Sequence, residues 1–226
     1  MSLTRSLIRE RLARPRRPSK YGDLNIAMKL VNAENVIPFD PQQHSAGSFV
    51  APNPRPADGS FVPAAVLVPL VEHADGFTII LTQRMADLKA HAGQISFPGG
   101  RIEPDDRDAE AGALREAHEE VGLEPSRVEI LGRLDPYVTV TGFEVTPVVG
   151  AITPPLLLKP DPREVADIFE VPLAFILDRV NHQRHSRTTA SGIKRAYYAL
   201  PYGDRYIWGA TAGMLINLYE VLTSVP

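Results

Sequence analysis

The sequence predicts a single α/β domain, and three observations lead to that class. Strand-like apolar segments recur between residues 64 and 152. A Glu-rich segment with helical spacing interrupts them between Arg115 and Leu123. Residues 211–221 then carry apolar side chains at helical spacing. Strands and helices mixed in this order are typical of one α/β domain with one hydrophobic core.

The predicted strands are short apolar segments bounded by turn residues. A turn near Asp75-Gly76 joins the first two of them, and Pro154-Pro155 ends the fifth. The strands are expected at residues 64–71, 77–84, 94–97, 128–134, 144–152, 196–200 and 206–208, while 166–169 is short and ambiguous. Between the third strand and the Glu-rich helix, Phe97-Pro98-Gly99-Gly100 permits a tight turn and close approach of the backbone to a ligand.

The Glu-rich helix has recognisable ends and an apolar face. Asp106 and Asp108 are suitable N-cap residues, and Gly122 is placed to end the helix in left-handed geometry. The apolar face predicted to meet the core consists of Leu114, Ala117 and Val121. Two further helices are expected at residues 173–177 and 211–221, the second with Met214, Leu215, Leu218 and Val221 at helical spacing.

The first 60 residues differ in composition from the rest. In residues 1–20 only Glu10 opposes seven basic residues, which are Arg5, Arg9, Arg11, Arg14, Arg16, Arg17 and Lys20. A run of this kind is usually a solvated tail or a surface helix, which we favour over a nucleic-acid-binding arm. The prolines from Pro15 to Pro18 argue against a long amphipathic transit helix. Residues 36–63 contain six prolines and are expected to be irregular and draped over the core.

Composition excludes several classes of function. The 226-residue chain is 44% hydrophobic and 23% charged, which suits one sizeable core. A formal net charge of −3 gives no general attraction to nucleic acid or to an anionic membrane. The chain has no cysteine, so disulfides, a thiolate nucleophile and a zinc–thiolate site are excluded. Without a membrane-length apolar run or a secretory signal pattern, we expect a cytoplasmic protein with no membrane partner.

The chemistry is predicted by three carboxylates on one face of the Glu-rich helix. Glu116, Glu119 and Glu120 stand at i, i+3 and i+4, and like charges at that spacing oppose helix formation by about 0.2–0.5 kcal/mol per pair. A divalent cation such as Mg²⁺ or Mn²⁺ would neutralise them, and such ions are usually shared with substrate phosphates. The alternative is a solvated acidic face. The flanking glycines and Arg115 favour the metal site.

The segment from Gly100 to Leu123 resembles the Nudix box, G-x5-E-x7-R-E-U-x-E-E-x-G-U, where U is aliphatic. The matching residues are Arg115, Glu116, Glu119, Glu120, Gly122 and Leu123, with the small Ala117 in the first aliphatic position. One departure is that fourteen residues separate Gly100 from Arg115, where the general pattern has thirteen. No Glu stands at the early acidic position, for which Asp105, Asp106 and Asp108 are the candidates.

The preceding segment narrows the resemblance to one branch of the family. Residues 80–84 (ILTQR) and 88–100 (LKAHAGQISFPGG) look like the LLTxR…HxGQxxFPGG signature of the coenzyme A pyrophosphatases, in which the longer box is also usual. Lys89 stands where this branch commonly has Arg. Further similar stretches are 141–149, 161–165 and 207–212, so the resemblance covers roughly residues 62–222.

The resemblance implies a fold, a reaction and a set of site residues. The fold would be the Nudix α/β/α sandwich around a mixed sheet, a Nudix hydrolase domain at residues 61–226 after a basic and proline-rich lead-in at 1–60. The reaction would be metal-dependent cleavage of coenzyme A or acyl-CoA to 3′,5′-ADP and (acyl-)phosphopantetheine. The catalytic residues would be Arg115, Glu116, Glu119 and Glu120, the three glutamates also binding Mg²⁺ or Mn²⁺, and the substrate-binding residues Arg84, Lys89, His91, Gly99 and Gly100.

Individual roles are less determined than the site as a whole. Glu116 and Glu120 would hold the metal, while Glu119 either completes the coordination or acts as general base. Arg115 would orient one of the glutamates, with a phosphate contact as the second choice. Glu164 is either an extra acid near the metal or a surface residue. His91 is as readily a packed or hydrogen-bonded residue as a phosphate contact. His182 and His185 are expected in a solvated polar loop.

Two alternative functions stay open. The first keeps the chemistry and changes the substrate to another nucleoside diphosphate derivative, such as ADP-ribose, NADH or a capped RNA end. The second is a non-catalytic nucleotide-binding regulatory module on the same fold. Retention of all three glutamates favours catalysis. The expected partner is therefore a small-molecule nucleoside diphosphate; nucleic acid is disfavoured, and a homodimer is open.

Overall fold

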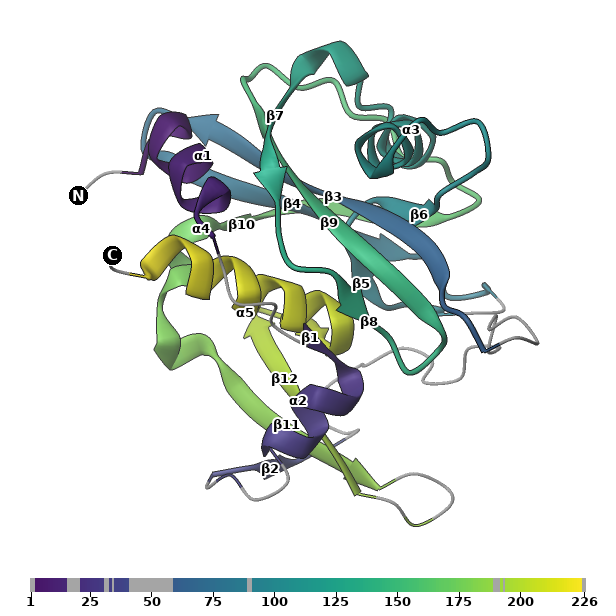
Figure 1. Cartoon of the computed structure of the whole chain (residues 1–226), viewed down its shortest axis with the longest axis vertical. Coiled ribbons are helices and arrows are strands. Elements are labelled where there is room, and N and C mark those ends of the chain that lie inside the picture. The colour runs from purple at the N-terminus through teal and green to yellow at the C-terminus, as the bar shows by residue number, and fades with distance from the viewer. Residues whose placement is uncertain are drawn as a thin grey trace.

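The computed structural model describes residues 3–15, 21–30, 33, 35–40, 59–88, 91–188, 192 and 194–224. Within these residues the chain forms two sheets with helix α5 (Gly209–Thr223) between them (Figure 1). Helix α3 (Ala109–Val121) covers the opposite face of the larger sheet. The predicted α/β/α sandwich around a mixed sheet is therefore confirmed, with a second sheet added beyond α5.

The larger sheet has nine strands and mixed pairing. Its path is β1 (Tyr21–Gly22), β8 (Tyr137–Val138), β9 (Phe143–Ile152), β3 (Val62–His73), β4 (Gly76–Arg84) and β10 (Val165–Pro172). Off this path, β5 (Ile95–Ser96) pairs with β4, β6 (Gly99–Arg101) with β3, and β7 (Val128–Arg133) with β9. The central β3–β9 pair is parallel, whereas β4 is antiparallel to both neighbours.

The smaller sheet has four strands in the order β13 (Arg205–Trp208), β12 (Lys194–Tyr202), β11 (Gln183–Thr188) and β2 (Ile37–Pro38). Strand β11 corrects the prediction of a solvated loop around His182 and His185. His185 is buried: the Tyr206 hydroxyl lies 2.9 Å from its Nδ1, and Gln183 Oε1 lies 2.8 Å from its Nε2. All six residues of this strand, QRHSRT, are polar, so composition alone does not show that His185 and Ser186 are buried.

Helix α3 begins and ends as its sequence predicts. Asp108 is the N-cap, and its carboxylate accepts a 2.8 Å hydrogen bond from the backbone N–H of Ala111. Gly122 ends the helix with φ of 67°, a left-handed conformation that glycine adopts without steric cost. Ala117 and Val121 are buried against the larger sheet, as predicted, and the half-buried Leu114 packs at the edge of the same cluster.

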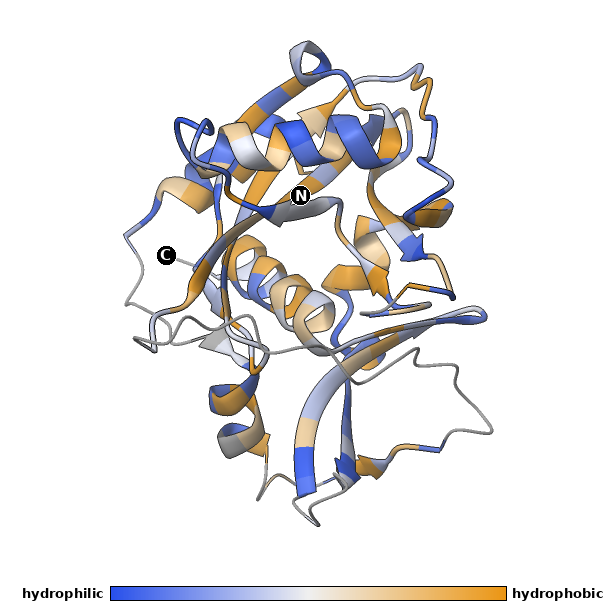
Figure 2. Ribbon diagram, turned by 90° about the vertical axis from the view of Figure 1, so that its right-hand side faces the viewer, coloured by the Kyte–Doolittle hydropathy of each residue, from blue (hydrophilic) through white to orange (hydrophobic). Residues whose placement is uncertain are grey.

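Helix α5 is buried over most of its surface because it has a sheet on each side. Figure 2 shows it as largely hydrophobic, whereas α3 shows a hydrophilic outer face. Side chains of α5 pack with those of β12, β13 and the larger sheet in one continuous core. Short helix α4 (Leu173–Leu177) follows β10, and 3₁₀ turns occupy Pro125–Arg127 and Arg179–Asn181. The helices expected at 173–177 and 211–221 are thus confirmed.

The N-terminal segment contributes to this core through two helices. In α1 (Arg5–Ala13) the side chains of Ile8 and Leu12 are buried, and Arg5 and Arg9 form ion pairs with Glu129. Helix α2 (Asp23–Leu30), which the sequence did not predict, buries Ile26 and Leu30. The surface-helix prediction for residues 1–20 holds for 5–13, while residues 41–58 lie outside the described part of the chain. The division at residue 60 stays a prediction.

Most predicted strands are confirmed, usually with one or two residues added at an end. The ambiguous segment 166–169 lies within β10. One expectation was wrong: Gly99 and Gly100 do not form a tight turn but begin strand β6, paired with Val66 and Ala65 of β3. Glycine disfavours strands, but here close packing leaves no room for side chains.

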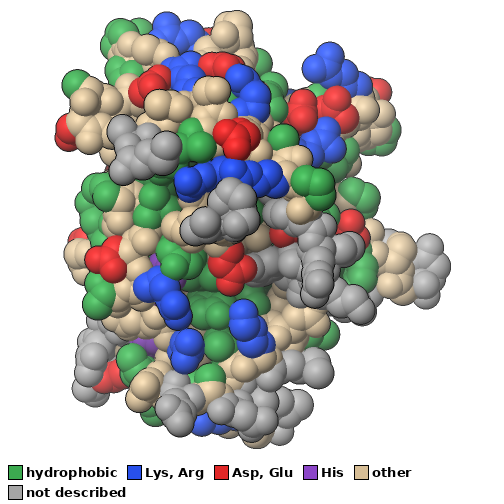
Figure 3. Space-filling model, turned by 60° about the vertical axis from the view of Figure 1, so that its left-hand side comes forward, with side chains coloured by type: hydrophobic (Ala, Val, Ile, Leu, Met, Phe, Trp, Pro, Cys, Tyr) green, Lys and Arg blue, Asp and Glu red, His purple; other side chains and the backbone are tan. Residues whose placement is uncertain are grey.

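The surface has mixed charge on the face shown in Figure 3. Lys and Arg side chains are interspersed with Asp and Glu over its upper half, and lower down several Lys and Arg side chains border a hydrophobic area. In the part of the chain that the structure describes, no helix is both long and apolar enough to cross a lipid bilayer. The sequence-based expectation that nucleic acid is not a partner stays a prediction.

Candidate active site

Three glutamates of α3 lie on one face of the helix and differ in burial. The Glu120 side chain is 5% exposed, that of Glu116 18% and that of Glu119 57%. The face therefore runs from a buried carboxylate beside the sheet to an exposed one at the surface. A buried carboxylate needs a hydrogen-bond donor or a cation, so the partners of these three groups define the site.

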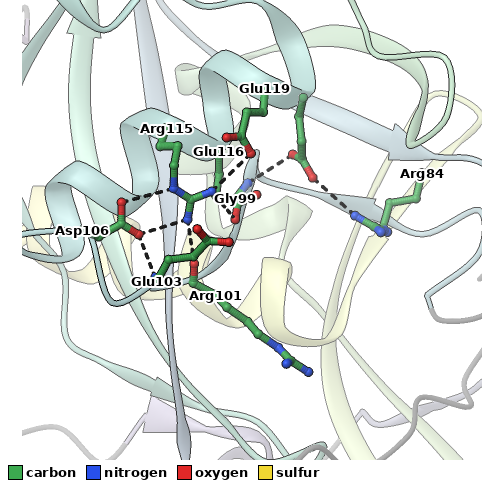
Figure 4. Close-up of polar contacts among 9 residues, drawn as sticks. Arg84, Gly99, Arg101, Glu103, Asp106, Arg115, Glu116 and Glu119 are labelled. Atoms are coloured by element: carbon green, nitrogen blue, oxygen red, sulfur yellow. Dashed lines mark hydrogen bonds and ion pairs between the residues drawn. The ribbon is translucent and has the colours of Figure 1, made fainter.

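Arg115 is the centre of a dense network (Figure 4). Its Nε and Nη2 contact the two carboxylate oxygens of Asp106 at 3.2 and 3.0 Å, a bidentate arrangement. Its Nη1 donates to Glu116 Oε1 at 3.0 Å and to Glu119 Oε2 at 3.2 Å, and its Nη2 also donates to the carbonyl of Arg101 at 3.0 Å. This guanidinium thus fixes two of the three glutamates against the loop that precedes α3.

Glu120 lies on the other side of the cluster, toward β4. Its Oε2 accepts a 3.2 Å hydrogen bond from the backbone N–H of Gly99, and its Oε1 lies 3.5 Å from Nη1 of Arg84. Arg84 is the last residue of β4, and its Nη2 lies 3.8 Å from Oε2 of Glu164. Two elements of the sheet, β4 and β6, therefore supply the partners of the most buried glutamate.

Glu164 joins the same group from the loop before β10. This loop is attached to the end of α3, because the N–H groups of Lys159 and Asp161 donate to the carbonyls of Val121 and Glu120, both at 2.9 Å. It is also attached to the end of β4, because the N–H of Met85 donates to the Glu164 carbonyl at 2.9 Å. Of the two alternatives for Glu164, the structure supports a carboxylate close to the cluster, although its side chain is half exposed.

The two glycines of β6 make room for the cluster. A Cβ atom on Gly100 would lie 2.5 Å from Oε1 of Glu116, and one on Gly99 would lie 2.5 Å from the Ala65 carbonyl oxygen. Gly99 also has a positive φ of 156°, a backbone conformation that residues other than glycine rarely adopt. Gly100 is therefore required by the position of a carboxylate, and Gly99 by the position of the neighbouring strand.

The burial and the contacts of these carboxylates shift their pKa values. Burial raises the pKa of Glu120 to about 7; the Gly99 N–H and Arg84 oppose that rise, and the nearby Glu164 and Glu116 add to it. Burial also raises the pKa of Glu116, with Arg115 acting in the opposite direction. The Arg115 guanidinium lowers the pKa of Asp106 below its usual value. Burial is therefore the main cause of both raised pKa values, and the neighbouring carboxylates add to it.

The residues of the cluster fit a hard divalent cation in donor chemistry. Carboxylate oxygens are the donors that Mg²⁺ and Mn²⁺ prefer, and Glu116, Glu119, Glu120 and Glu164 supply them. As the side chains lie, however, no group of three His, Cys, Asp or Glu residues within the described ranges is arranged closely enough to hold a metal ion. One carboxylate oxygen of each glutamate is in contact with an arginine: Arg115 contacts Oε1 of Glu116 and Oε2 of Glu119, and Arg84 contacts Oε1 of Glu120.

The remaining residues that the sequence predicted for the site do not all lie beside the glutamates. Arg84, Gly99 and Gly100 lie against the glutamates, as described above. His91 has a φ of 55° and its Nδ1 lies 2.9 Å from Oε1 of Gln94, so it is a hydrogen-bonded residue of the loop before β5. Lys89, the other predicted phosphate contact, lies outside the described residues.

Two partners in the site were not identified uniquely from the sequence. Asp106 was one of three candidates for the early acidic position, and its contact with Arg115 distinguishes it from Asp108, which caps the helix. The Arg101 carbonyl, which accepts from Arg115, has no side-chain signal. Only the helix-cap pattern could have separated Asp106 from Asp108, because an N-cap carboxylate is already engaged by the backbone.

Comparison with known proteins is consistent with this site. Residues 61–190 match the family described as NUDIX domain. An "Uncharacterized Nudix hydrolase NudL" of Pectobacterium atrosepticum is 43% identical over 172 residues, covering 72% of this chain and 84% of that protein. The protein of the same description in Escherichia coli K12 is 42% identical over 155 residues, covering 69% of this chain and 80% of that protein.

A solved structure extends the similarity to three dimensions. The Nudix hydrolase RenU of M. smegmatis superposes with a TM-score of 0.52 and covers 75% of this chain and 93% of its own. Sequence identity in that alignment is 20%, so the likeness concerns the fold alone.

Proposed function

The chain belongs to the Nudix hydrolase family, and we propose that it cleaves the pyrophosphate bond of coenzyme A or acyl-CoA with the help of a divalent cation. The observation that carries the reaction is the buried carboxylate of Glu120 beside Glu116, on a helix face that also bears Glu119. The similarity of residues 80–100 to the coenzyme A pyrophosphatase signature supports the substrate. The products would be 3′,5′-ADP and (acyl-)phosphopantetheine.

Glu116 and Glu120 would hold the metal ion, either Mg²⁺ or Mn²⁺, and Glu119 would complete its coordination or act as general base. When bound, the cation offsets the charge of the diphosphate and makes a coordinated water more acidic. Glu120 is held in position for this role by the Gly99 N–H, and Glu116 by Arg115. Glu119, the most exposed of the three, can move most easily to accept a proton.

Arg115 orients carboxylates in this proposal and does not bind phosphate. Its donors are engaged by Asp106, Glu116, Glu119 and a backbone carbonyl. A phosphate contact would break part of this network and would release Asp106, whose side chain is only 7% exposed. The charge-assisted bonds to Asp106 also fix the side-chain rotamer of Arg115, and through it the position of Glu116.

Substrate binding would involve β4, β6 and the segment between β4 and β5. Arg84 brings a guanidinium to the edge of the glutamate cluster, and we assign it, Lys89 and His91 to the phosphates of the coenzyme. The contact of His91 with Gln94 orients its ring, which leaves Nε2 as the proposed phosphate contact. Gly99 and Gly100 would allow the diphosphate to approach the backbone. The cytoplasmic location and a homodimer stay predictions.

A chromatographic assay tests the proposal directly. The purified chain is incubated with coenzyme A, ADP-ribose or NADH, each with Mn²⁺, with Mg²⁺ and with excess chelator. We expect 3′,5′-ADP from coenzyme A only when metal is present, and none from Glu120→Gln. Turnover of a different diphosphate alone would keep the reaction and reject the substrate. Inactivity on every substrate would favour a non-catalytic nucleotide-binding module.

A further inference from the structure

We propose that Arg84 is the internal counter-cation of the metal-free centre, and that a divalent cation must displace its guanidinium from Glu120 and Glu164 in order to bind. This inference rests on the metal-dependent function proposed above. It assigns Arg84 a positioning role in metal loading, which is distinct from a contact with substrate. It also explains why four neighbouring carboxylates are not gathered into a ready metal site.

The first support is the place of Arg84 between two carboxylates. Its Nη1 lies 3.5 Å from Oε1 of Glu120, and its Nη2 lies 3.8 Å from Oε2 of Glu164. Glu120 comes from α3 and Glu164 from the loop before β10, so one guanidinium links two elements that meet at the end of β4. It reaches the only one of the three box glutamates that Arg115 does not contact.

The second support is that Arg84 is held loosely. Its two charged contacts are longer than every contact of Arg115, which lie between 3.0 and 3.2 Å. Its Nε is buried and has no hydrogen-bond partner among the residues that the structure describes. Attraction between charges, and not a fitted set of hydrogen bonds, therefore holds this guanidinium in place. Such a group can leave when a stronger cation arrives.

Arg205 shows what a fixed arginine in the same part of the molecule looks like. Its Nη1 donates to Gln83 Oε1 and its Nη2 to Asp167 Oδ2, both at 2.6 Å. Its guanidinium carbon lies 4.6 Å from the ring centre of Phe169. The side chains of Arg205 and Arg84 are equally covered, at 25% and 23% exposed, yet only Arg205 has short bonds and a stacking partner.

A divalent metal ion and the Arg84 guanidinium cannot both contact the Glu120 carboxylate in its present position. A bound Mg²⁺ lies about 2.0–2.1 Å from a carboxylate oxygen. The guanidinium is 3.5 Å from Oε1 of the same carboxylate, whose side chain is only 5% exposed, so two cations placed there would repel each other. The divalent ion has the larger charge, so Arg84 leaves. Its planar fork is then available for a diphosphate oxygen, which makes metal binding precede substrate binding.

Calorimetric titration of the metal-free protein with Mn²⁺ tests this competition without any substrate. Arg84→Met removes the charge and keeps an unbranched side chain, and Arg205→Met is the matched control. We expect Arg84→Met to bind Mn²⁺ roughly threefold to fivefold more tightly than wild type, the range expected for loss of one partly exposed charge pair. Arg205→Met should bind Mn²⁺ with wild-type affinity.

Thermal unfolding provides the second measurement. Without Arg84, the buried Glu120 lacks its cation until metal is added, so Mn²⁺ should raise the Tm of Arg84→Met by more than it raises that of wild type. Should Arg84→Met fail to fold, Arg84→Gln removes the charge and keeps donors for the same carboxylate.

The outcomes separate this inference from the proposed function. Equal or weaker Mn²⁺ binding by the Arg84 variants, with wild type still cleaving coenzyme A, would overturn the counter-cation role and leave the function standing. A wild-type protein that binds no Mn²⁺ and no Mg²⁺ would overturn both. Tighter binding by both Arg84→Met and Arg205→Met would also count against it, because the effect would then be general.

Discussion

The two sides of helix α3 hold their carboxylates in different ways. On the side of the preceding loop, Arg115 makes five contacts of 3.0–3.2 Å and joins Asp106, Glu116 and Glu119. On the side of β4, Arg84 makes two contacts of 3.5 and 3.8 Å to Glu120 and Glu164. The residue types are the same, and both arginine side chains are about one quarter exposed.

We interpret the Arg115 network as a fixed support for the carboxylates, and the Arg84 pair as a contact that a metal ion can replace. Removing one partner of the Arg115 network leaves buried charge behind, so that side is costly to rearrange. The Arg84 side has longer contacts, and its buried Nε has no hydrogen-bond partner among the described residues, so fewer hydrogen bonds are lost when another cation takes its place beside Glu120. A metal centre needs both properties, since its ligands must be oriented before the ion arrives and must be free to accept it. The following predictions test that division of roles.

The largest expected effect is on turnover when the buried carboxylate is neutralised. Glu120→Gln keeps the shape and an acceptor for the Gly99 N–H, but loses the charge that we propose binds the metal. Loss of several kcal/mol of metal stabilisation lowers kcat by about a thousandfold. Glu119→Gln, at the exposed end of the same face, should cost far less. Steady-state kinetics with coenzyme A compares them, and equal losses would show that burial does not rank the ligands.

A smaller effect on activity is expected when an added methyl group displaces Glu116, one of the glutamates that Arg115 holds. In Gly100→Ala the new Cβ would lie 2.5 Å from Oε1 of Glu116, whose carboxylate must then move away from its contact with Arg115. Because ligand orientation is typically worth about 10- to 100-fold, kcat should fall by that amount while the Tm changes little. In Gly99→Ala the clash is with the Ala65 backbone, so folding should suffer instead. A Gly100→Ala enzyme with normal kcat would show that Glu116 need not be fixed.

The next prediction concerns the pH dependence of stability on the fixed side. Arg115 lowers the pKa of Asp106 in the folded protein, so this pair stabilises the fold above the unfolded pKa of about 3.9 and the benefit is lost as pH falls through the folded value. Asp106→Asn should cost about 2 kcal/mol at pH 7, because charge-assisted bonds are lost. Thermal unfolding at pH 7, 5, 4 and 3 should show the gap to wild type closing below pH 4. A gap independent of pH would exclude the ion pair as its source.

The smallest effect is expected from loss of the N-cap of α3, because Asp108 stabilises the start of the helix and is not one of the three glutamates on its charged face. Asp108→Ala removes the acceptor for the Ala111 N–H and should cost about 1 kcal/mol of stability. That corresponds to a fall of about 2–4 °C in Tm for a chain of this size. The kcat at 25 °C should stay at the wild-type value. A large loss of kcat would mean that the helix start, and not only its side chains, determines the geometry of the site.

Local features of the sequence predicted the helix and its charged face well. The caps of α3, its buried Ala117 and Val121, and the grouping of three glutamates all depend on spacing within about one turn, which a sequence displays directly. The longer strands β3, β4, β7 and β9 of the larger sheet were predicted from their apolar segments, whereas the short strands β1, β6 and β8 were not. The family resemblance added the reaction, which no local pattern contains.

Contacts between distant segments could not be predicted in this way. Helix α2 has mixed polarity and strand β11 is wholly polar, and both are ordered by partners elsewhere in the chain, such as β12. The contact of Arg84 with Glu120 joins residues 36 positions apart, and no spacing rule brings them together. The choice of Asp106 over its neighbours likewise depends on the direction of Arg115 in the folded protein.

The attachment of the 159–164 loop to α3 has a mechanical consequence. The side chain of Glu120 carries a carboxylate of the proposed metal site, while its carbonyl oxygen accepts the Asp161 N–H. The helix therefore cannot rotate about its axis without breaking the loop away from it, and the loop cannot swing without pulling on the end of β4 at Met85. Three backbone hydrogen bonds therefore join the helix end, the loop and the strand end. Opening of the site would therefore begin with side chains at its exposed rim, because these hydrogen bonds restrain the backbones of Glu120 and Glu164.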